Sequence, residues 1–232
     1  MSKQAQSPQP MAFAILRNTH EVLRNAITLM DACLDKGDLD EFRQEWGNFR
    51  RCRRSHVAME DGAVFSLLDE VSGGAITEAG FMQEHEEDEF NAIKVEQADS
   101  ADKVAQAFAT WKTHQLDHMA HEEKIMGPLT MKASPTPEGR GKVVHERLVL
   151  PAIEYGDFDW YLAFVIKRLT AYGTAQQPPN VAVRVFAWGL QHASTPTQWE
   201  SWKKIVQDNT SNEIWQEMVV QFQIDTEGKI TD

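Results

Sequence analysis

The sequence predicts an all-α protein, built as an antiparallel four-helix bundle followed by a smaller helical extension. Apolar residues recur with the helical period in four successive segments, at residues 11–34, 39–71, 77–96 and 101–126. Short turns separate these segments, which is typical of antiparallel neighbours in a bundle. Strand-like alternation never extends beyond a few residues. These observations together favour a helical bundle over any fold that contains a sheet.

Start and stop signals mark the ends of these segments. Gly37 ends the first segment, and Asp38 with Glu41 three residues later forms a capping pair for the second. The Ser-Gly-Gly sequence at 72–74 ends the second segment. The Gly-Pro pair at 127–128 is predicted to end the fourth, because proline lacks a backbone donor and clashes with the preceding turn.

The composition changes after residue 130. Residues 131–142 are rich in proline and glycine and are predicted to form a loop, and residues 143–225 are predicted to form a helical extension. Helical patterns in the extension fall at 159–173, 180–193, 197–208 and 211–222. Five of the seven tryptophans lie there, and we expect them to pack inside the extension or against the bundle: Trp160, Trp188, Trp199, Trp202 and Trp215. Residues 1–10 are predicted to be a disordered N-terminus and residues 226–232 a tail.

Charge and composition narrow the range of partners. The 232 residues carry a net charge of −12, which argues against a nucleic acid or an anionic membrane as partner. The two cysteines form no Cys-x-x-Cys motif, which fits a reducing compartment. The first ten residues lack the pattern of a signal peptide, and the longest apolar run is too short to span a bilayer. We therefore expect a cytoplasmic protein with no nucleic-acid or membrane partner.

Histidine and glutamate recur in a pattern that suits a metal site. Three His-x-x-x-Glu pairs are present: His56/Glu60, His85/Glu89 and His118/Glu122. Residues four apart lie about 40° apart on one helical face, so each pair can direct an imidazole and a carboxylate to one point. With His20, each predicted bundle helix carries one histidine near its middle. Each histidine alone is more simply a hydrogen-bonded core residue, but four together favour a site for iron, manganese or zinc.

The histidine and glutamate pattern resembles the hemerythrin-like, or HHE cation-binding, domain over about residues 11–130. The fourth segment carries the most specific part, His118-Met-Ala-His-Glu122-Glu, followed by apolar residues and Pro-Leu. The resemblance implies a four-helix bundle that holds two non-haem iron ions, bridged by two carboxylates and an oxo or hydroxo group. Carried over residue by residue, it implies these ligands: His20, His56, Glu60, His85, His118 and Glu122. Manganese or zinc in place of iron stays open.

The sequence departs from the oxygen-carrying members of that family at two positions. Those members have a second histidine on the third helix, where this sequence has Glu89, and an aspartate on the fourth, where it has Glu123. Glu89 is therefore expected as a seventh ligand. Glu122 is preferred to Glu123, because a residue at i+4 lies closer to the face of His118 than one at i+5. Neutral imidazoles favour reversible O₂ binding and anionic carboxylates favour O₂ activation, so this ligand set lies between the two regimes.

Further polar residues near the pairs are assigned to the surface. His114 and His121 flank His118 and are expected to be partly exposed beside the site, with a supporting role or a fifth imidazole as the alternative. Asp61 is expected to lie on a solvated face, and the acidic run 84–89 to be solvated or to draw cations toward the bundle. The arginines at 50, 51, 53 and 54 cover too many helical directions for a core and are expected to form an exposed patch that pairs with acids elsewhere.

The function predicted from these features is that of a non-haem di-iron protein of hemerythrin type. It binds or reacts with O₂ or a related small oxidant, such as peroxide or nitric oxide. Whether it is an enzyme is open; if so, it is a di-iron oxidoreductase with peroxidase- or oxidase-type chemistry. The alternatives are an iron or O₂ sensing or storage module, and a metal-free helical scaffold for protein interactions. A homodimer formed through the extension is also left open.

Overall fold

The computed structural model describes residues 14–133 and 137–221. All of the secondary-structure elements named in these residues are helices. The first part holds α1 (Ala14–Lys36), α2 (Leu39–Met59), the π-helical turn η2 (Glu60–Val64), α3 (Phe65–Ser72), α4 (Ala75–Ala79), α5 (Phe81–Glu96) and α6 (Ala101–Ala133). The second holds α7 (Pro137–Val144), the π-helical turn η3 (His145–Val149), α8 (Leu150–Tyr155), α9 (Phe158–Tyr172), α10 (Pro179–His192), α11 (Pro196–Asn209) and α12 (Asn212–Gln221). The prediction of an all-α protein is confirmed. The N-terminus predicted to be disordered, 1–10, and the tail 226–232 lie outside the described residues.

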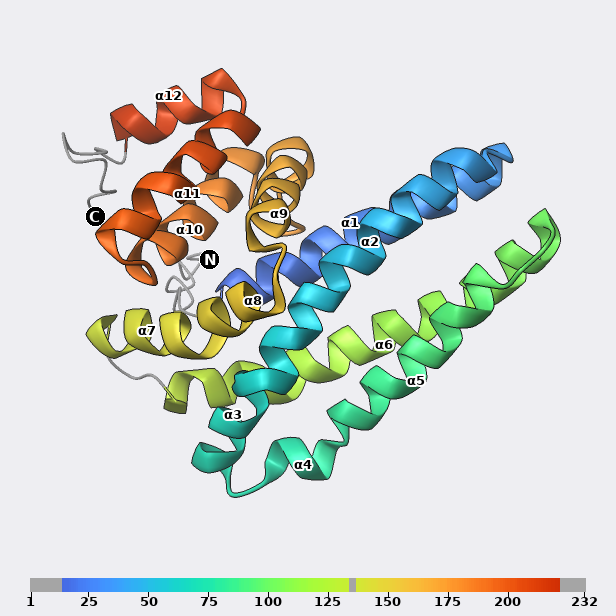
Figure 1. Ribbon diagram of the computed structural model, residues 1–232, viewed down its shortest axis with the longest axis horizontal. Helices are drawn as coiled ribbons and strands as arrows, with labels where there is room; N and C mark the ends of the chain where they lie inside the picture. Colours follow the sequence, from blue (N-terminus) through green and yellow to red (C-terminus); the bar gives the residue numbers. More distant parts are fainter. Residues whose placement is uncertain (1–13, 134–136, 222–232) are drawn as a thin grey trace, which may run out of the picture.

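Two long helical hairpins, α1–α2 and α5–α6, carry the four histidines predicted as metal ligands (Figure 1). Gly37 adopts a left-handed φ of 73° at the first turn, and the Asp38 carboxylate accepts a 3.0 Å hydrogen bond from the Glu41 backbone N–H. Asp38 is thus confirmed as the N-cap of α2. Both hairpin turns lie at the same end of the molecule, on the right in Figure 1. Helices α2 and α6 therefore run away from that end, and α5 runs toward it.

The helices in the middle of the chain are interrupted at more points than the sequence predicts. Helices α2 and α3 are continuous through the π turn Glu60–Val64. The segment predicted as one helix over 77–96 is divided, because Gly80 adopts a left-handed φ of 79° between α4 and α5. The Asp69 carboxylate accepts hydrogen bonds from the backbone N–H groups at the start of α4, which fixes the corner between the two hairpins.

The predicted helix end at Gly127–Pro128 is wrong, because α6 continues to Ala133. An internal proline removes one backbone hydrogen bond and costs about 3 kcal/mol. Met126 and Leu129 are both buried, and we attribute the continuation of the helix to their packing. The predicted loop at 131–142 is also wrong over its described residues, since 131–133 end α6 and α7 begins at Pro137. Proline is tolerated at a first helical position, where its missing donor would be unpaired in any case.

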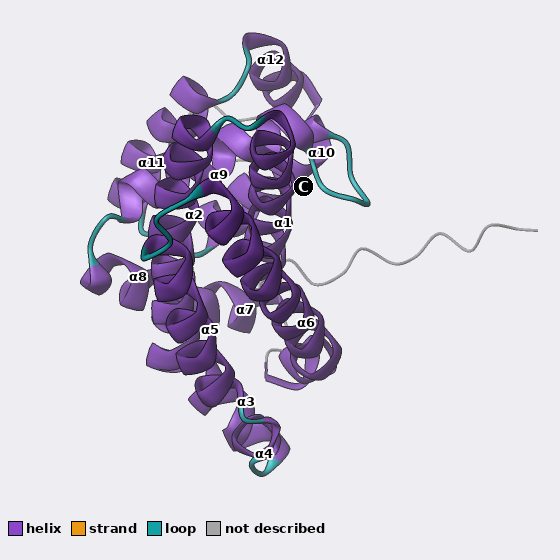
Figure 2. Cartoon of the chain, turned by 90° about the vertical axis from the view of Figure 1, so that its right-hand side faces the viewer, coloured by secondary structure: helices purple, strands orange, loops and turns teal. Residues whose placement is uncertain are grey.

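Helices α7–α12 form a compact extension that packs against α1 and α2 (Figures 1 and 2). Trp199 and Trp202 are buried in it, and the Trp202 ring lies 5.0 Å from that of Phe158, centroid to centroid. The other tryptophans of the extension are partly buried against the core. The expectation that these residues pack is confirmed. Among the described residues, no helix is both long enough and apolar enough to cross a membrane.

Candidate metal centre

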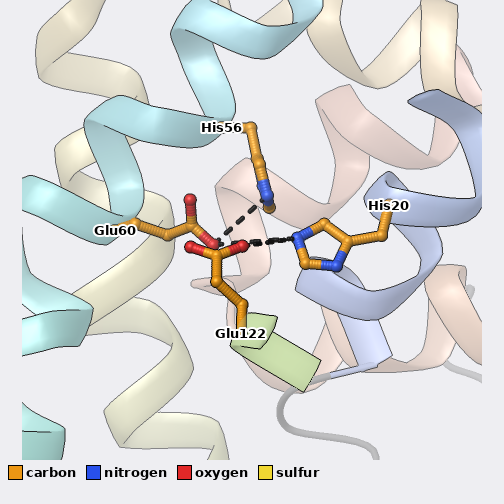
Figure 3. Close-up of side chains that lie close together, drawn as sticks. All are labelled: His20, His56, Glu60 and Glu122. Atoms are coloured by element: carbon orange, nitrogen blue, oxygen red, sulfur yellow. Dashed lines mark ion pairs between the residues drawn. The ribbon is translucent and has the colours of Figure 1, made fainter. Parts of the chain in front are cut away.

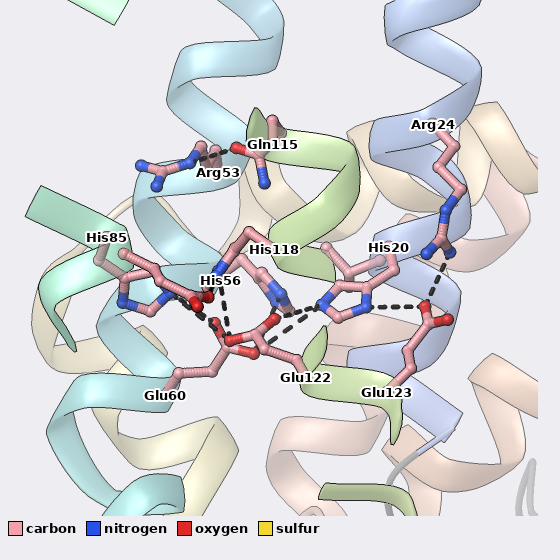
Figure 4. Close-up of polar contacts among 12 residues, drawn as sticks. His20, Arg24, Arg53, His56, Glu60, His85, Gln115, His118, Glu122 and Glu123 are labelled. Carbon is pink, nitrogen blue, oxygen red and sulfur yellow. Dashed lines mark hydrogen bonds and ion pairs between the residues drawn. The ribbon is translucent and has the colours of Figure 1, made fainter. Parts of the chain in front are cut away.

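Four imidazoles and two carboxylates converge in the bundle, and they come from all four long segments (Figures 3 and 4). They are His20 on α1, His56 on α2, Glu60 on η2, His85 on α5, and His118 and Glu122 on α6. None of these side chains is more than 5% exposed. The helical period explains the convergence, since each histidine lies on the apolar face of its own helix.

Glu60 lies between two groups of imidazoles. Its Oε1 atom is 3.2 Å from Nε2 of His56 and 3.9 Å from Nε2 of His20. Its Oε2 atom is 3.6 Å from Nε2 of His85. One carboxylate thus presents one oxygen to each side of the cluster.

Glu122 repeats this arrangement from the opposite helix. Its Oε2 atom is 3.3 Å from Nε2 of His20. Its Oε1 atom is 3.3 Å from Nε2 of His118 and 3.6 Å from Nε2 of His85. The cluster is therefore two pairs of imidazoles, one from α1 and α2 and one from α5 and α6, which share two carboxylates.

The inward atoms of the cluster are buried and have no hydrogen-bond partner. These atoms are Nε2 of His20, His56 and His85, and all four carboxylate oxygens of Glu60 and Glu122. Leaving one such polar group unpaired costs about 1–3 kcal/mol, and more when it is charged. A divalent cation satisfies lone pairs of this kind, and a set of imidazoles and carboxylates suits iron, manganese or zinc. The residues present therefore fit a metal centre.

The outward nitrogens of three histidines are held by carboxylates. The Nδ1 atoms pair as follows: His20 with Glu123 at 3.0 Å (Figure 4), His85 with Asp61 at 2.9 Å, and His118 with Glu84 at 2.7 Å. Such bonds fix the tautomer and orientation of a metal-binding histidine and raise its basicity. These roles differ from the expectation, which placed Asp61 on a solvated face and Glu84 in an acidic run that is solvated or draws cations. Asp61 reaches His85 from the π turn, which has no sequence signature.

The neighbouring histidines lie outside the cluster. Nδ1 of His121 donates to the Glu84 carboxylate at 2.8 Å, and the side chain is 35% exposed. Nδ1 of His114 donates to the Asp88 carboxylate at 2.7 Å, and the side chain is 27% exposed. Asp88 is fully buried and forms a 2.9 Å ion pair with Arg53. The structure thus places both histidines on the rim of the site.

Glu89, expected as a seventh ligand, is not brought to the cluster. Its carboxylate forms a double hydrogen bond with the guanidinium of Arg50, at 2.5 and 2.6 Å, and is 41% exposed. Helix α5 runs opposite to α2 and α6, so a step of four residues from His85 leads toward the hairpin turns. The same step from His56 or His118 leads away from them, to the level of the shared carboxylates.

The register of the fourth helix is resolved in the structure. Glu122 points into the cluster, whereas Glu123 points out and pairs with Arg24 at 2.7 Å. The arginine patch also differs from the expectation, because Arg50 and Arg53 are buried. Both are paired with acids of α5, which is what makes a buried guanidinium tolerable.

Packing these groups together shifts their pKa values strongly. Burial lowers the pKa of His20, but the nearby carboxylates of Glu122 and Glu123 outweigh this and raise the pKa to about 10. Burial and the charge of Glu122 raise the pKa of Glu60 to about 8. Burial and the positive charge of His20 hold the pKa of His56 well below its ordinary value. Protons thus compete with a cation for these atoms, as is general for metal ligands.

Comparison with known proteins agrees with this geometry. The family model described as the hemerythrin HHE cation binding domain matches residues 11–130. No curated protein and no solved structure matches the chain. The matched segment covers more than half of the 232 residues and contains all six residues of the cluster. The chain therefore belongs to the hemerythrin HHE cation-binding family.

Proposed function

We propose that this protein holds two iron ions in the cluster and that the centre binds or reacts with O₂ or a related small oxidant, such as peroxide or nitric oxide. One observation carries the proposal: two pairs of buried imidazoles share two carboxylates, and each carboxylate presents one oxygen to each pair. A single ion would leave one pair of imidazoles unused. Two ions use all the inward donor atoms.

The residues divide into two ligand sets. His20 and His56 would hold one ion, and His85 and His118 the other, while Glu60 and Glu122 would bridge them. When bound, an iron pair supplies two redox-active ions that can exchange electrons with a small oxidant. Glu123, Asp61 and Glu84 keep three of the imidazoles oriented with Nε2 toward the shared carboxylates, where the ions would be held.

The size of the reacting molecule follows from burial. Because the six side chains are at most 5% exposed, no bulky substrate touches the centre in this structure. A diatomic molecule or peroxide needs only a brief opening between side chains. The absence of Glu89 from the cluster leaves four imidazoles and two carboxylates, a donor set that supports both binding and turnover of such molecules.

We expect the iron-loaded protein, prepared without oxygen, to change its visible absorption spectrum when O₂ is admitted. Full return of the spectrum when O₂ is removed would assign reversible binding, as in a carrier or sensor. Steady consumption of O₂ or peroxide with a reductant present would assign an oxidoreductase. The matched control is the same protein with His56 and His118 replaced by alanine. A spectrum unchanged by O₂, peroxide and nitric oxide alike would contradict the proposal.

A further inference from the structure

The described helices of the extension pack mainly against one side of the candidate metal centre. Helices α9 and α10 pack on α1, and α8 and α9 pack on α2, whereas α5 packs mainly on α6 (Figure 1). The extension therefore backs the helices that carry His20, His56 and Glu60. The contacts described below fall within two residues of His20 and of Glu60.

The first contact holds α1 one residue before His20. Tyr161 of α9 is fully buried, and its hydroxyl lies 2.5 Å from the Thr19 hydroxyl. Thr19 donates its own proton to the backbone carbonyl of Ile15 at 2.9 Å. Tyr161 is therefore the donor, and Thr19 accepts. This bond links the extension to the backbone turn that directs His20.

The second contact holds α1 one residue after His20. The backbone N–H of Ala175, in the turn between α9 and α10, donates a 2.8 Å hydrogen bond to the Glu21 carboxylate. Gly173 shapes this turn with a φ of 64°, and a β-carbon there would lie 2.5 Å from the carbonyl oxygen of Gln177. The turn is thus tightly built, and it presents its N–H group to α1.

Glu21 also connects to the outer nitrogen of His20. It forms a 2.9 Å ion pair with Arg24, which forms a 2.7 Å ion pair with Glu123. Glu123 in turn holds Nδ1 of His20 at 3.0 Å. The turn at Ala175 is therefore connected to His20 through three charged side chains, of which Figure 4 shows Arg24 and Glu123.

The third contact lies on the π turn that carries Glu60. Pro151 of α8 packs over Gly62, where an added β-carbon would lie 3.5 Å from the Pro151 β-carbon. The π turn of the bundle, η2, packs here against η3 of the extension. Isolated π turns are uncommon, and many lie at functional sites. Packing from the extension thus supports the turn that directs Glu60 into the cluster.

The other half of the centre is held differently. Nδ1 of His118 is held by Glu84, and Nδ1 of His85 by Asp61, and these two carboxylates belong to the bundle. The contacts of the extension described above are made to α1 and to the α2–η2 segment. The two contacts on α1 therefore flank a histidine of the first half, whereas the contact at the π turn lies beside Glu60 and Asp61 and reaches both halves.

We propose that the C-terminal extension is a positioning module for one half of the metal centre. By fixing α1 on both sides of His20, it sets the geometry of the His20–His56 position. Tyr161, in the extension, and Glu21, on α1, are the positioning residues. Of the three contacts, the His85–His118 position shares only the one at the π turn, through Glu60 and Asp61. This inference rests on the proposed function, because it requires that both positions bind an ion.

The test replaces Tyr161 by phenylalanine in the full chain, which removes the hydroxyl and keeps the ring. Iron binding is measured by anaerobic titration, and Mössbauer spectroscopy then reports each iron environment separately. We expect one of the two ions to bind roughly tenfold more weakly, the low end of the effect of supporting residues. We also expect the spectrum of one iron to change while the other is retained. Tyr172→Phe, at a half-exposed tyrosine of the same helix, is the control and is expected to match the wild type.

A reciprocal variant identifies the affected position. Glu84→Gln removes the carboxylate behind His118, so it is expected to change the iron signal that Tyr161→Phe leaves intact. Glu21→Ala removes the α1 side chain that accepts the Ala175 hydrogen bond, and it provides a second variant if Tyr161→Phe does not fold. It is expected to affect the same iron as Tyr161→Phe.

The outcomes separate this inference from the proposed function. Wild-type protein that binds no iron would overturn both. Wild-type protein with two irons, and extension variants with unchanged spectra and affinities, would overturn only the positioning role. Equal weakening of both ions by Tyr161→Phe and Glu21→Ala would also overturn it, because general destabilisation does not select one position.

Discussion

Glu122→Ala is expected to abolish the binding of both ions. Its two oxygens face different pairs of imidazoles, with Nε2 of His20 on one side and Nε2 of His118 on the other, each at 3.3 Å. Loss of this side chain removes one donor from each position and the link between them. We expect the iron content of the purified variant to fall to background in elemental mass spectrometry. A variant that retains one full equivalent of iron would show that Glu122 serves a single position.

Glu89→Ala is the matched control for Glu122→Ala. It removes the same kind of side chain from the same bundle, but from a carboxylate that pairs with Arg50 outside the cluster. The iron content is expected to stay at the wild-type value. The variant is expected to lose some stability, because it leaves the buried guanidinium of Arg50 with Glu96 as its remaining partner.

Iron is expected to stabilise the folded protein, because the ligands converge only in the folded state. Free iron at about a hundred times its dissociation constant adds about 2.7 kcal/mol to the free energy of unfolding. For a chain of this size, this raises the melting temperature by roughly 5–10 °C. Anaerobic addition of iron to the metal-free protein, followed by thermal unfolding, measures the shift. An equal shift in Glu122→Ala would assign the stabilisation to another site.

Much of the fold could be predicted from the sequence because it depends on local patterns. The helical period, the turn at Gly37 and the cap at Asp38 are each encoded within a few residues. The end of α6 could not be predicted in this way. Pro128 is a local stop signal, and burial of the residues around it, a property of the tertiary structure, accompanies the continuation of the helix.

The candidate site shows the same division. The convergence of the four histidines could be predicted, because each predicted bundle helix carries one of them near its middle. Glu89 could not be separated from the two shared carboxylates by spacing alone, because all three stand four residues after a histidine. The direction of each helix distinguishes Glu89 from Glu60 and Glu122. The predicted antiparallel topology already implied these directions. The roles of Asp61 and Glu84 could not be read in advance, since they depend on a π turn and on contacts between helices.

The count of iron atoms per chain tests the central claim most directly. Protein from iron-supplemented cells, purified without an affinity tag, is analysed by elemental mass spectrometry. Two ligand sets that share two carboxylates predict about two iron atoms per chain, as in other bundle carboxylate sites. No bound metal, together with a melting temperature unchanged by anaerobic iron, would contradict the assignment of the cluster as a di-iron centre.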